Sequence, residues 1–137
     1  MSLFTQDDLI DSYSRTDAID DGVLIDVSAA AREFGIRYPV AMTRAAWTDC
    51  VEWTEADDRR KGTVQDETGR LADVLAVLGF TLRRSRAASA SNRTTFEVMR
   101  TTRAGSGRLP QRVVLECICG PGDDVEPALT ILLPGED

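Results

Sequence analysis

The chain has 137 residues, of which 23 are acidic and 16 basic, and its formal net charge is −7. This length fits one domain of common size, and no apolar run approaches the roughly 20 residues of a membrane-spanning helix. There is no histidine, which removes the usual general base, the Ser-His and Cys-His nucleophile pairs and the commonest transition-metal ligand. The start, MSLFTQDD, lacks the basic and apolar regions of a signal peptide, so we expect a cytoplasmic protein.

The N-terminal part predicts short helices that alternate with short strands. We expect a helix over residues 17–21, a strand over 23–27 and a helix over 29–34. Residues 36–42 are expected to be extended because Tyr38 precedes a proline. Since Pro39 lacks a backbone N–H, this piece is predicted to be an edge strand or an irregular approach to one.

The middle of the chain predicts two longer helices separated by a polar segment. The first covers about 44–53 and turns Trp47, Cys50 and Val51 toward the core. Residues 54–62, TEADDRRKG, are expected to form a solvated segment. The second helix covers about 64–82 and carries one apolar face, made by Leu71, Val74, Leu75, Leu78 and Leu82.

The C-terminal part predicts three strands joined by loops rich in small residues. They cover residues 93–103, 111–119 and 128–133, and a turn is expected at 120–123. Helices early in the chain and strands late in it predict the α+β class. We therefore expect a single α+β domain over residues 1–137, with N-terminal helices and short strands, one long helix and a C-terminal three-stranded antiparallel meander.

Charge is sorted into three blocks along the chain. Residues 1–58 have a net charge of −9, residues 59–112 a net charge of +8 and residues 113–137 a net charge of −6. Such asymmetry indicates a charged working surface, or acidic and basic faces that meet inside the fold. Fifteen arginines against a single lysine, Lys61, nearly exclude Schiff-base chemistry and favour bidentate recognition of carboxylate or phosphate.

Several stretches in fixed order span nearly the whole chain and carry a family resemblance. They are Ser12-Tyr13-Ser14-Arg15, residues 21–28 (DGVLIDVS), residues 38–41 (YPVA), Thr43-Arg44-Ala45 with Trp47, residues 69–75 (GRLADVL), Gly120-Pro121-Gly122-Asp123 and residues 130–137 (TILLPGED). With them the chain resembles a family of small uncharacterised proteins carried on bacterial plasmids and other mobile elements. The resemblance implies a cytoplasmic accessory protein of such an element, and it carries over no catalytic residue.

The basic segment is the first candidate site. Contact with nucleic acid or phosphate would use the arginines at its helix end and on its hairpin, namely Arg83, Arg84, Arg86, Arg93, Arg100, Arg103 and Arg108. Only one aromatic residue, Phe96, lies nearby, and we expect it to be buried, which disfavours a single-strand binder. The net negative charge also opposes long-range attraction to nucleic acid. We therefore favour a solvated face that is partly paired with the acidic blocks, including a cross-strand pair of Glu116 with an arginine.

The second candidate site is acidic and would contact a protein. It comprises Trp53, predicted to be exposed, with the acids around it, Glu52, Glu55, Asp57 and Asp58. Dense acids of this kind could imitate a phosphate backbone and occupy a DNA-binding partner. More often they serve solubility and helix capping.

Metal binding and thiol chemistry receive less support. A Mg²⁺ or Mn²⁺ site would draw on Asp26, Asp49, Glu52 and Asp73, but no spacing organises them. Cys117 and Cys119 share one strand face and, with Cys50, are expected to be structural thiols in the core. The predictions therefore include no metal and no cofactor.

The leading hypothesis is a non-enzymatic interaction or regulatory protein of a mobile element, which binds a protein partner through segregated charged surfaces. Two alternatives stay open. The first is nucleic-acid or phosphate binding through the hairpin at 83–112. The second is a small hydrolase or transferase that uses carboxylates and arginines, which the missing histidine disfavours. The oligomeric state is left open.

Overall fold

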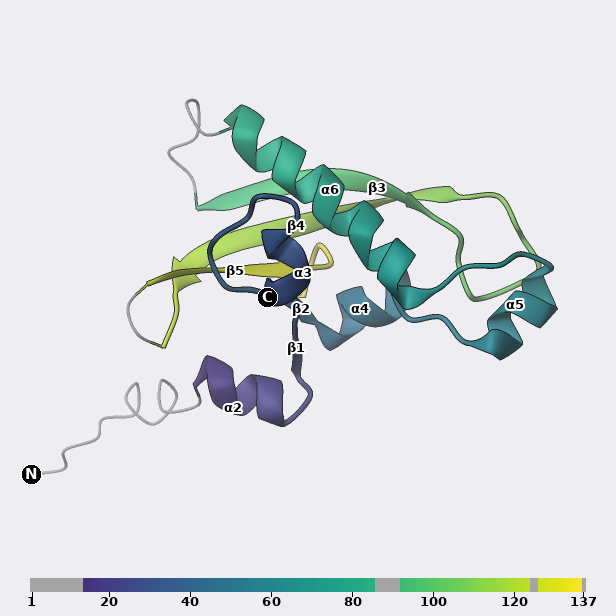
Figure 1. The fold of residues 1–137 in the computed structure, drawn as a ribbon, viewed down its shortest axis with the longest axis horizontal. Helices are drawn as coiled ribbons and strands as arrows, with labels where there is room; N and C mark the ends of the chain where they lie inside the picture. The colour runs from purple at the N-terminus through teal and green to yellow at the C-terminus, as the bar shows by residue number, and fades with distance from the viewer. Residues whose placement is uncertain (1–13, 86–91, 124–125, 137) are drawn as a thin grey trace, which may run out of the picture.

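The computed structural model describes residues 14–85, 92–123 and 126–136 (Figure 1). The elements of these residues follow one another as α2 (Arg15–Asp20), β1 (Leu24–Asp26), α3 (Ser28–Arg32), β2 (Val40–Thr43), α4 (Arg44–Cys50), α5 (Glu55–Lys61), α6 (Glu67–Ser85), β3 (Arg93–Arg100), β4 (Gln111–Pro121) and β5 (Pro127–Leu132). Residues 86–91, between α6 and β3, lie outside the described residues.

Within the described part of the chain, the strands form one five-stranded mixed sheet in the order β1-β2-β5-β4-β3. The β1–β2, β3–β4 and β4–β5 pairs are antiparallel, whereas β2 and β5 are parallel. The α+β class is confirmed. The expected three-stranded antiparallel meander is wrong, because the sheet does not end at β5 but continues through the parallel pair into β2 and β1.

The position of β2 inside the sheet also corrects the expectation of an edge strand. Val40, Ala41 and Met42 are fully buried between β1 and β5. Pro39 lies before the first paired residue, so its missing N–H removes no hydrogen bond from the ladder. Its carbonyl oxygen accepts a hydrogen bond of 2.8 Å from the N–H of Leu129, which starts the parallel pairing.

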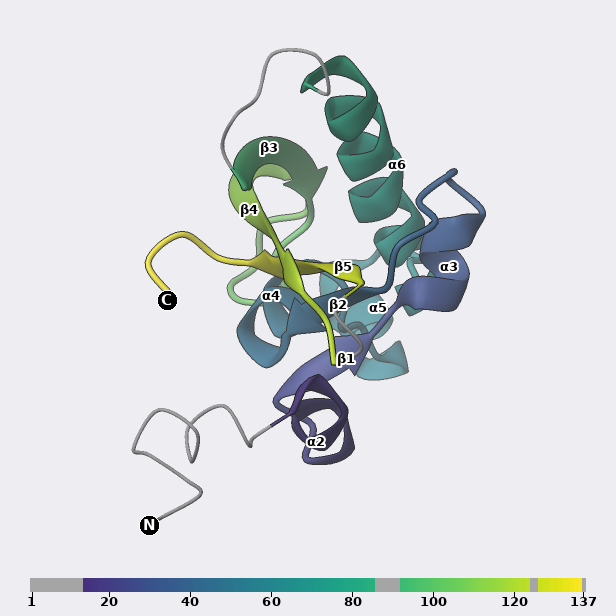
Figure 2. The ribbon, with the colours of Figure 1, turned by 90° about the vertical axis from the view of Figure 1, so that its left-hand side faces the viewer.

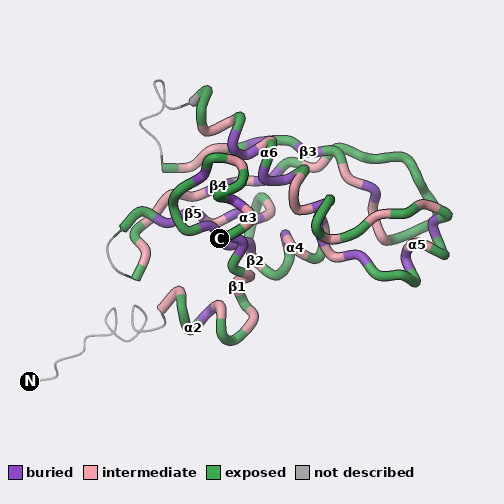
Figure 3. The backbone as a smooth tube through the Cα atoms, viewed as in Figure 1, coloured by how far each residue is buried: buried purple, intermediate pink, exposed green. Residues whose placement is uncertain are grey.

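One hydrophobic cluster joins the helices to one face of the sheet. Figure 2 shows α6 and α3 on the same side of the strands, and the buried positions recur along α6 with helical spacing (Figure 3). The cluster contains Leu75 and Leu78 of α6, Cys50 of α4, Phe96 of β3 and Leu115 of β4. Burial of Cys50, Phe96 and Cys117 confirms three of the sequence predictions.

The solvated polar segment expected at 54–62 folds as helix α5, and most of its residues are exposed as expected, whereas Asp57 and Lys61 are buried. Thr54 caps the helix in a reciprocal capping box with Asp57, and Gly62 ends it in the left-handed conformation at φ 66°. The helix has no apolar stripe, because its buried side chains are Asp57 and Lys61. Hydrophobic periodicity therefore cannot reveal it.

The N-terminal helix α2 is attached to the strands by polar contacts. Arg15 donates hydrogen bonds to the carbonyl oxygen of Leu129 and, at 2.8 Å, to the hydroxyl of Thr130. The carboxylate of Asp123 accepts from the backbone N–H groups of Arg15 and Thr16 at 2.9 and 3.0 Å. Ser14 caps the helix in a reciprocal capping box with Asp17.

No helix in the described part of the chain is long and apolar enough to cross a membrane.

Candidate functional site

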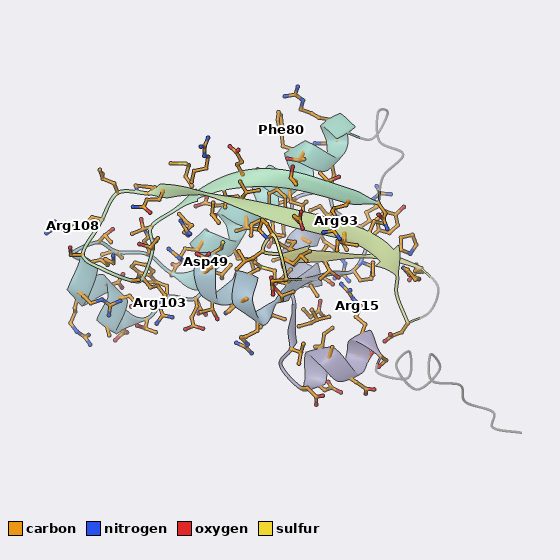
Figure 4. All side chains as sticks on the ribbon, turned by 180° about the vertical axis from the view of Figure 1, so that it is seen from behind. Arg15, Asp49, Phe80, Arg93, Arg103 and Arg108 are labelled. Atoms are coloured by element: carbon orange, nitrogen blue, oxygen red, sulfur yellow. The ribbon has the colours of Figure 1, made fainter. Side chains whose placement is uncertain are left out.

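The arginines of the basic segment are spread along the molecule and bound to partners within it. Arg93 pairs with Glu116 at 2.6 Å, which confirms the predicted cross-strand pair, and Arg100 pairs with Asp49 at 2.7 Å. Arg103 pairs with Asp57 at 2.7 Å. Figure 4 shows Arg103 and Arg108 at one end of the sheet and Arg93 toward the other. The described arginines thus do not gather on one uncovered face.

Three further arginines of this candidate site do not pair with a carboxylate among the residues that the structure describes. Arg83 donates a hydrogen bond of 3.3 Å to the carbonyl oxygen of Phe34. The guanidinium of Arg84 lies 5.5 Å from the ring centroid of Phe80. Arg108 is exposed and lies beside Gly62 at the end of α5. Arg86 falls outside the described residues.

Asp57 is the centre of an ionic cluster that ties α5 to the loop at 101–110. Its side chain is 1% exposed and accepts hydrogen bonds from Arg103 at 2.7 Å, from Arg60, and from the backbone N–H of Thr54 at 2.9 Å. Burial alone would raise the pKa of this carboxyl. The hydrogen bonds from Thr54, Arg103 and Arg60 outweigh burial and hold the pKa of Asp57 well below its ordinary value. Arg103 also pairs with Glu52.

The single lysine has a structural position in the same region. The Lys61 side chain is fully buried, and its ammonium donates to the carbonyl oxygens of Ala104 at 2.9 Å and Gly107 at 2.6 Å. Both acceptors belong to the loop at 101–110. The pairs of Arg100 and Arg103 with acids of residues 1–58 bring the acidic and basic blocks together inside the fold, as one of the two interpretations of the charge pattern predicts.

Trp53 is buried, so the expectation that it is exposed is wrong. Its side chain is 6% exposed, its indole N–H donates to Asp58 at 2.7 Å, and the guanidinium of Arg70 lies 4.6 Å from its ring centroid. Of the five residues expected to contact a protein, Asp57 is also buried, and Glu52 and Asp58 have partners within the fold. Glu55 stays exposed on the first turn of α5.

Arg70 connects three segments beneath a pocket. It donates hydrogen bonds to the carbonyl oxygens of Val51 at 3.1 Å and Thr101 at 3.0 Å and to the side-chain oxygen of Gln65 at 2.7 Å. Burial lowers the pKa of Arg70, but the group stays a cation at neutral pH because its ordinary value is so high. Sequence patterns did not single out this residue, since it sits among leucines on the apolar side of α6.

The pocket has a volume of about 420 Å³ and lies between the first half of α6 and the end of β3. Gly69, Arg70, Asp73 and Val74 line it from one side of α6, and Asp66 lines it from just before that helix. β3 with the following residue contributes Val98, Met99, Arg100 and Thr101. Cys50 also lines it. Val64, 90% exposed, and Met99, 58% exposed, line it as exposed apolar side chains. We had not predicted this site.

The chemistry of the pocket gives little support to a nucleophile. Burial raises the pKa of the Cys50 thiol to about 12, with a smaller contribution from Asp49, so the thiol is protonated at neutral pH. Arg100 and Arg70 donate to partners of the fold, whereas the carboxylates of Asp66 and Asp73 are on exposed residues. The pocket offers a ligand a mixed surface, in which the exposed apolar side chains of Val64 and Met99 lie beside polar groups and the carboxylates of Asp66 and Asp73.

The proposed metal ligands do not come together. Asp49 pairs with Arg100, Glu52 pairs with Arg103, and Asp26 accepts from the backbone N–H and hydroxyl of Ser28 at 3.0 and 2.6 Å. Among the residues that the structure describes, no group of three or more cysteines, aspartates or glutamates is placed to hold a metal ion.

The chain belongs to DUF6573, a family of unknown function whose model matches residues 1–137. A search of the curated proteins and a search of the solved structures each give no match.

Proposed function

We propose that the chain is a non-enzymatic, cytoplasmic interaction protein of a bacterial mobile genetic element, and that it acts by binding another protein. The observation that carries the proposal is the pocket between α6 and β3, which Val64 and Met99 line as exposed apolar side chains. Exposed apolar surface beside a concave site is typical of protein contacts. The resemblance to proteins of plasmids supports the mobile-element setting.

The ionic cluster changes where such a partner would bind. Glu52, Asp57 and Asp49 of the acidic block are bound to Arg103 and Arg100 of the basic block. These charges are therefore satisfied inside the protein and offer less to a partner than the sequence indicates. The exposed apolar side chains at the pocket, Val64 and Met99, are better candidate contacts than the charged blocks themselves.

Nucleic-acid binding remains the second candidate and has weaker support. Arg93, Arg100 and Arg103 each hold a carboxylate of the same chain. A phosphate backbone would have to compete with these ion pairs, and the net charge of −7 opposes its approach. An enzyme that uses carboxylates and arginines is supported least, because the arginines lining the pocket are engaged by the fold.

The proposal is tested by affinity capture from the lysate of the bacterium that carries the gene, with and without nuclease and at two salt concentrations. We expect a stoichiometric protein that survives nuclease and that the Met99→Asp variant no longer retains. Tyr38→Asp is the matched control, because Tyr38 is 51% exposed and does not line the pocket. Recovery of nucleic acid alone, or equal retention by Met99→Asp, would contradict the proposal.

A further inference from the structure

Helix α5 and the loop at 101–110 lie together at one end of the molecule (Figure 1). Residues 52–66 and 101–110 are referred to as the corner, and the structure describes all of them. Trp53 is the one apolar side chain of these described residues that is buried. The other buried side chains of the corner are polar or charged, namely Asp57, Lys61 and Thr101. The corner is therefore held in place mainly by polar contacts.

The apolar surface of Trp53 is buried apart from the main hydrophobic cluster. That cluster includes Cys50 and Val51 but not Trp53. The guanidinium of Arg70 lies 4.6 Å from the indole ring centroid, and the indole N–H donates to Asp58 at 2.7 Å. Since buried apolar contacts are the main stabilising contribution to a fold, the corner shares little of what stabilises the sheet and α6.

The two halves of the corner hold each other by contacts that run in both directions. From α5, Arg60 donates to the carbonyl oxygen of Arg103 at 2.9 Å, and Lys61 donates to two further carbonyl oxygens of the loop. From the loop, the guanidinium of Arg103 pairs with Asp57 at 2.7 Å. Displacement of either half therefore removes the partners of the other, so we expect the two halves to open together.

The corner also forms part of the pocket. The backbone N–H of Gln65 donates to Asp58 at 2.9 Å, and its side-chain amide donates to the hydroxyl of Thr101 at 3.1 Å. Both Gln65 and Thr101 line the pocket, and so do Val64 and Pro110 of the corner. The same contacts that join α5 to the loop thus place these residues in the pocket lining.

We propose that the corner opens as one unit while the sheet and α6 stay folded, and that this opening uncovers Trp53 and removes the corner residues from the pocket lining. Local opening of this kind is expected where polar contacts rather than apolar ones hold a segment. A partner that binds the complete pocket would favour the closed state. That last consequence rests on the proposed function, whereas the opening itself does not.

The test is hydrogen exchange measured by NMR on the full chain between zero and about 2 M urea. Two reporters lie at the end of α5 and beyond it, the backbone amide of Gly62, which donates to Asp58 at 2.9 Å, and that of Gln65. The indole N–H of Trp53 is the third. The reference is the amide of Leu75, in the fully buried part of α6.

We expect the three reporters to exchange with one common free energy of opening and one common urea slope. Both values should be smaller than those of Leu75, because opening of the corner exposes less surface than unfolding of the whole protein. Equal slopes at the reporters and at Leu75 would show that the corner unfolds only with the core. Different slopes among the reporters would show fraying of α5 alone. Either result would overturn the inference.

Two variants test which residues belong to the opening unit. Arg103→Gln removes the partner of Asp57 and Glu52 and destabilises the closed state relative to both the open and the unfolded states. Exchange should therefore accelerate about tenfold at the reporters and at Leu75 alike. Ile131→Val, the matched change in the sheet, removes one buried methyl group that stays buried when the corner opens. It should accelerate exchange at Leu75 about fivefold and leave the reporters unaltered.

The variants also separate this inference from the proposed function. Reporters that respond to Ile131→Val as strongly as Leu75 does, or that do not respond to Arg103→Gln, would contradict a separate opening unit. In that case a partner found by lysate capture would still support the proposed function. If capture finds no protein partner while the exchange results are as expected, the proposed function fails and the opening of the corner stands.

Discussion

Arg103 donates its Nε–H to the buried carboxylate of Asp57 over 2.7 Å, across 46 residues of sequence. The pair joins helix α5 to the loop that connects β3 and β4. Arg60 donates to the same carboxylate from within α5. The next residue, Lys61, donates to backbone carbonyl oxygens of that loop. Ordering of this corner therefore depends on charge pairing rather than on an apolar stripe.

Asp57→Asn should destabilise the protein by about 2–3 kcal/mol, because Arg103 and Arg60 lose a charged acceptor in a partly buried site. Urea unfolding followed by circular dichroism measures the change. The control is Glu55→Gln, which lies on the same first turn but is exposed and should cost less than about 0.5 kcal/mol. Equal effects of the two variants would show that the ion pair contributes nothing specific.

Stability should also fall in acid. The pKa of Asp57 lies below its ordinary value in the folded protein, so near pH 4 the unfolded chain binds more protons than the folded one. The contribution of this group is present above about pH 4 and is lost as the pH falls toward the folded pKa. The pKa of Asp123 is also lowered, chiefly by hydrogen bonds from Thr16 and Arg15. The stability that this carboxylate contributes is therefore also lost as the pH falls.

The measurement is the free energy of unfolding between pH 3 and pH 7 for the wild type and Asp57→Asn. The variant should show a shallower loss of stability below pH 4.5, and the two curves should converge in acid. Parallel curves over the whole range would contradict the assignment of the titration to Asp57.

Local sequence patterns correctly predicted the elements that can be recognised from a single segment of the chain. The leucine face of α6 and the alternation of Phe96 and Val98 in β3 are properties of single segments, and both predictions hold. The parallel pairing of β2 with β5 could not be predicted in this way, because Val40 and Leu129 meet across most of the chain. Pro39, which favoured an edge strand, lies one residue outside the paired segment.

The candidate site was predicted less well for the same reason. Trp53 lies among acids in the sequence, but Arg70 and Asp58 fold over it and bury it. The interpretation of the arginines as partly paired with the acidic blocks is confirmed by Arg100 and Arg103. The pocket depends on where α6 crosses the end of β3, which no single segment encodes.

Replacement of Lys61 should release the loop at 101–110. Lys61→Met keeps the length of the side chain but leaves the carbonyl oxygens of Ala104 and Gly107 without their donor, which should cost about 2 kcal/mol. Limited digestion with trypsin and mass spectrometry should find faster cleavage after Arg103 and Arg108. Arg59→Met is the control, since it also removes one cleavage site from α5 but at an exposed position. Unchanged cleavage in Lys61→Met would show that the loop is held by other contacts.

The thiols of Cys50 and Cys117 should resist modification in the folded protein. Burial raises the pKa of both to about 12, so at pH 8 only about one thiol in ten thousand is ionised. Cys119 is half-buried, and we expect that Ellman's reagent modifies it alone in the native protein and all three cysteines in urea.

The Cys119→Ser variant should then show no reaction at all before unfolding, which separates the two buried thiols from the half-buried one. The result bears on function, because Cys50 lines the pocket beside β3. Rapid modification of Cys50 in the native protein would mean that a thiolate forms there. Since such a group could act as a nucleophile, that outcome would favour an enzyme over a protein-binding site.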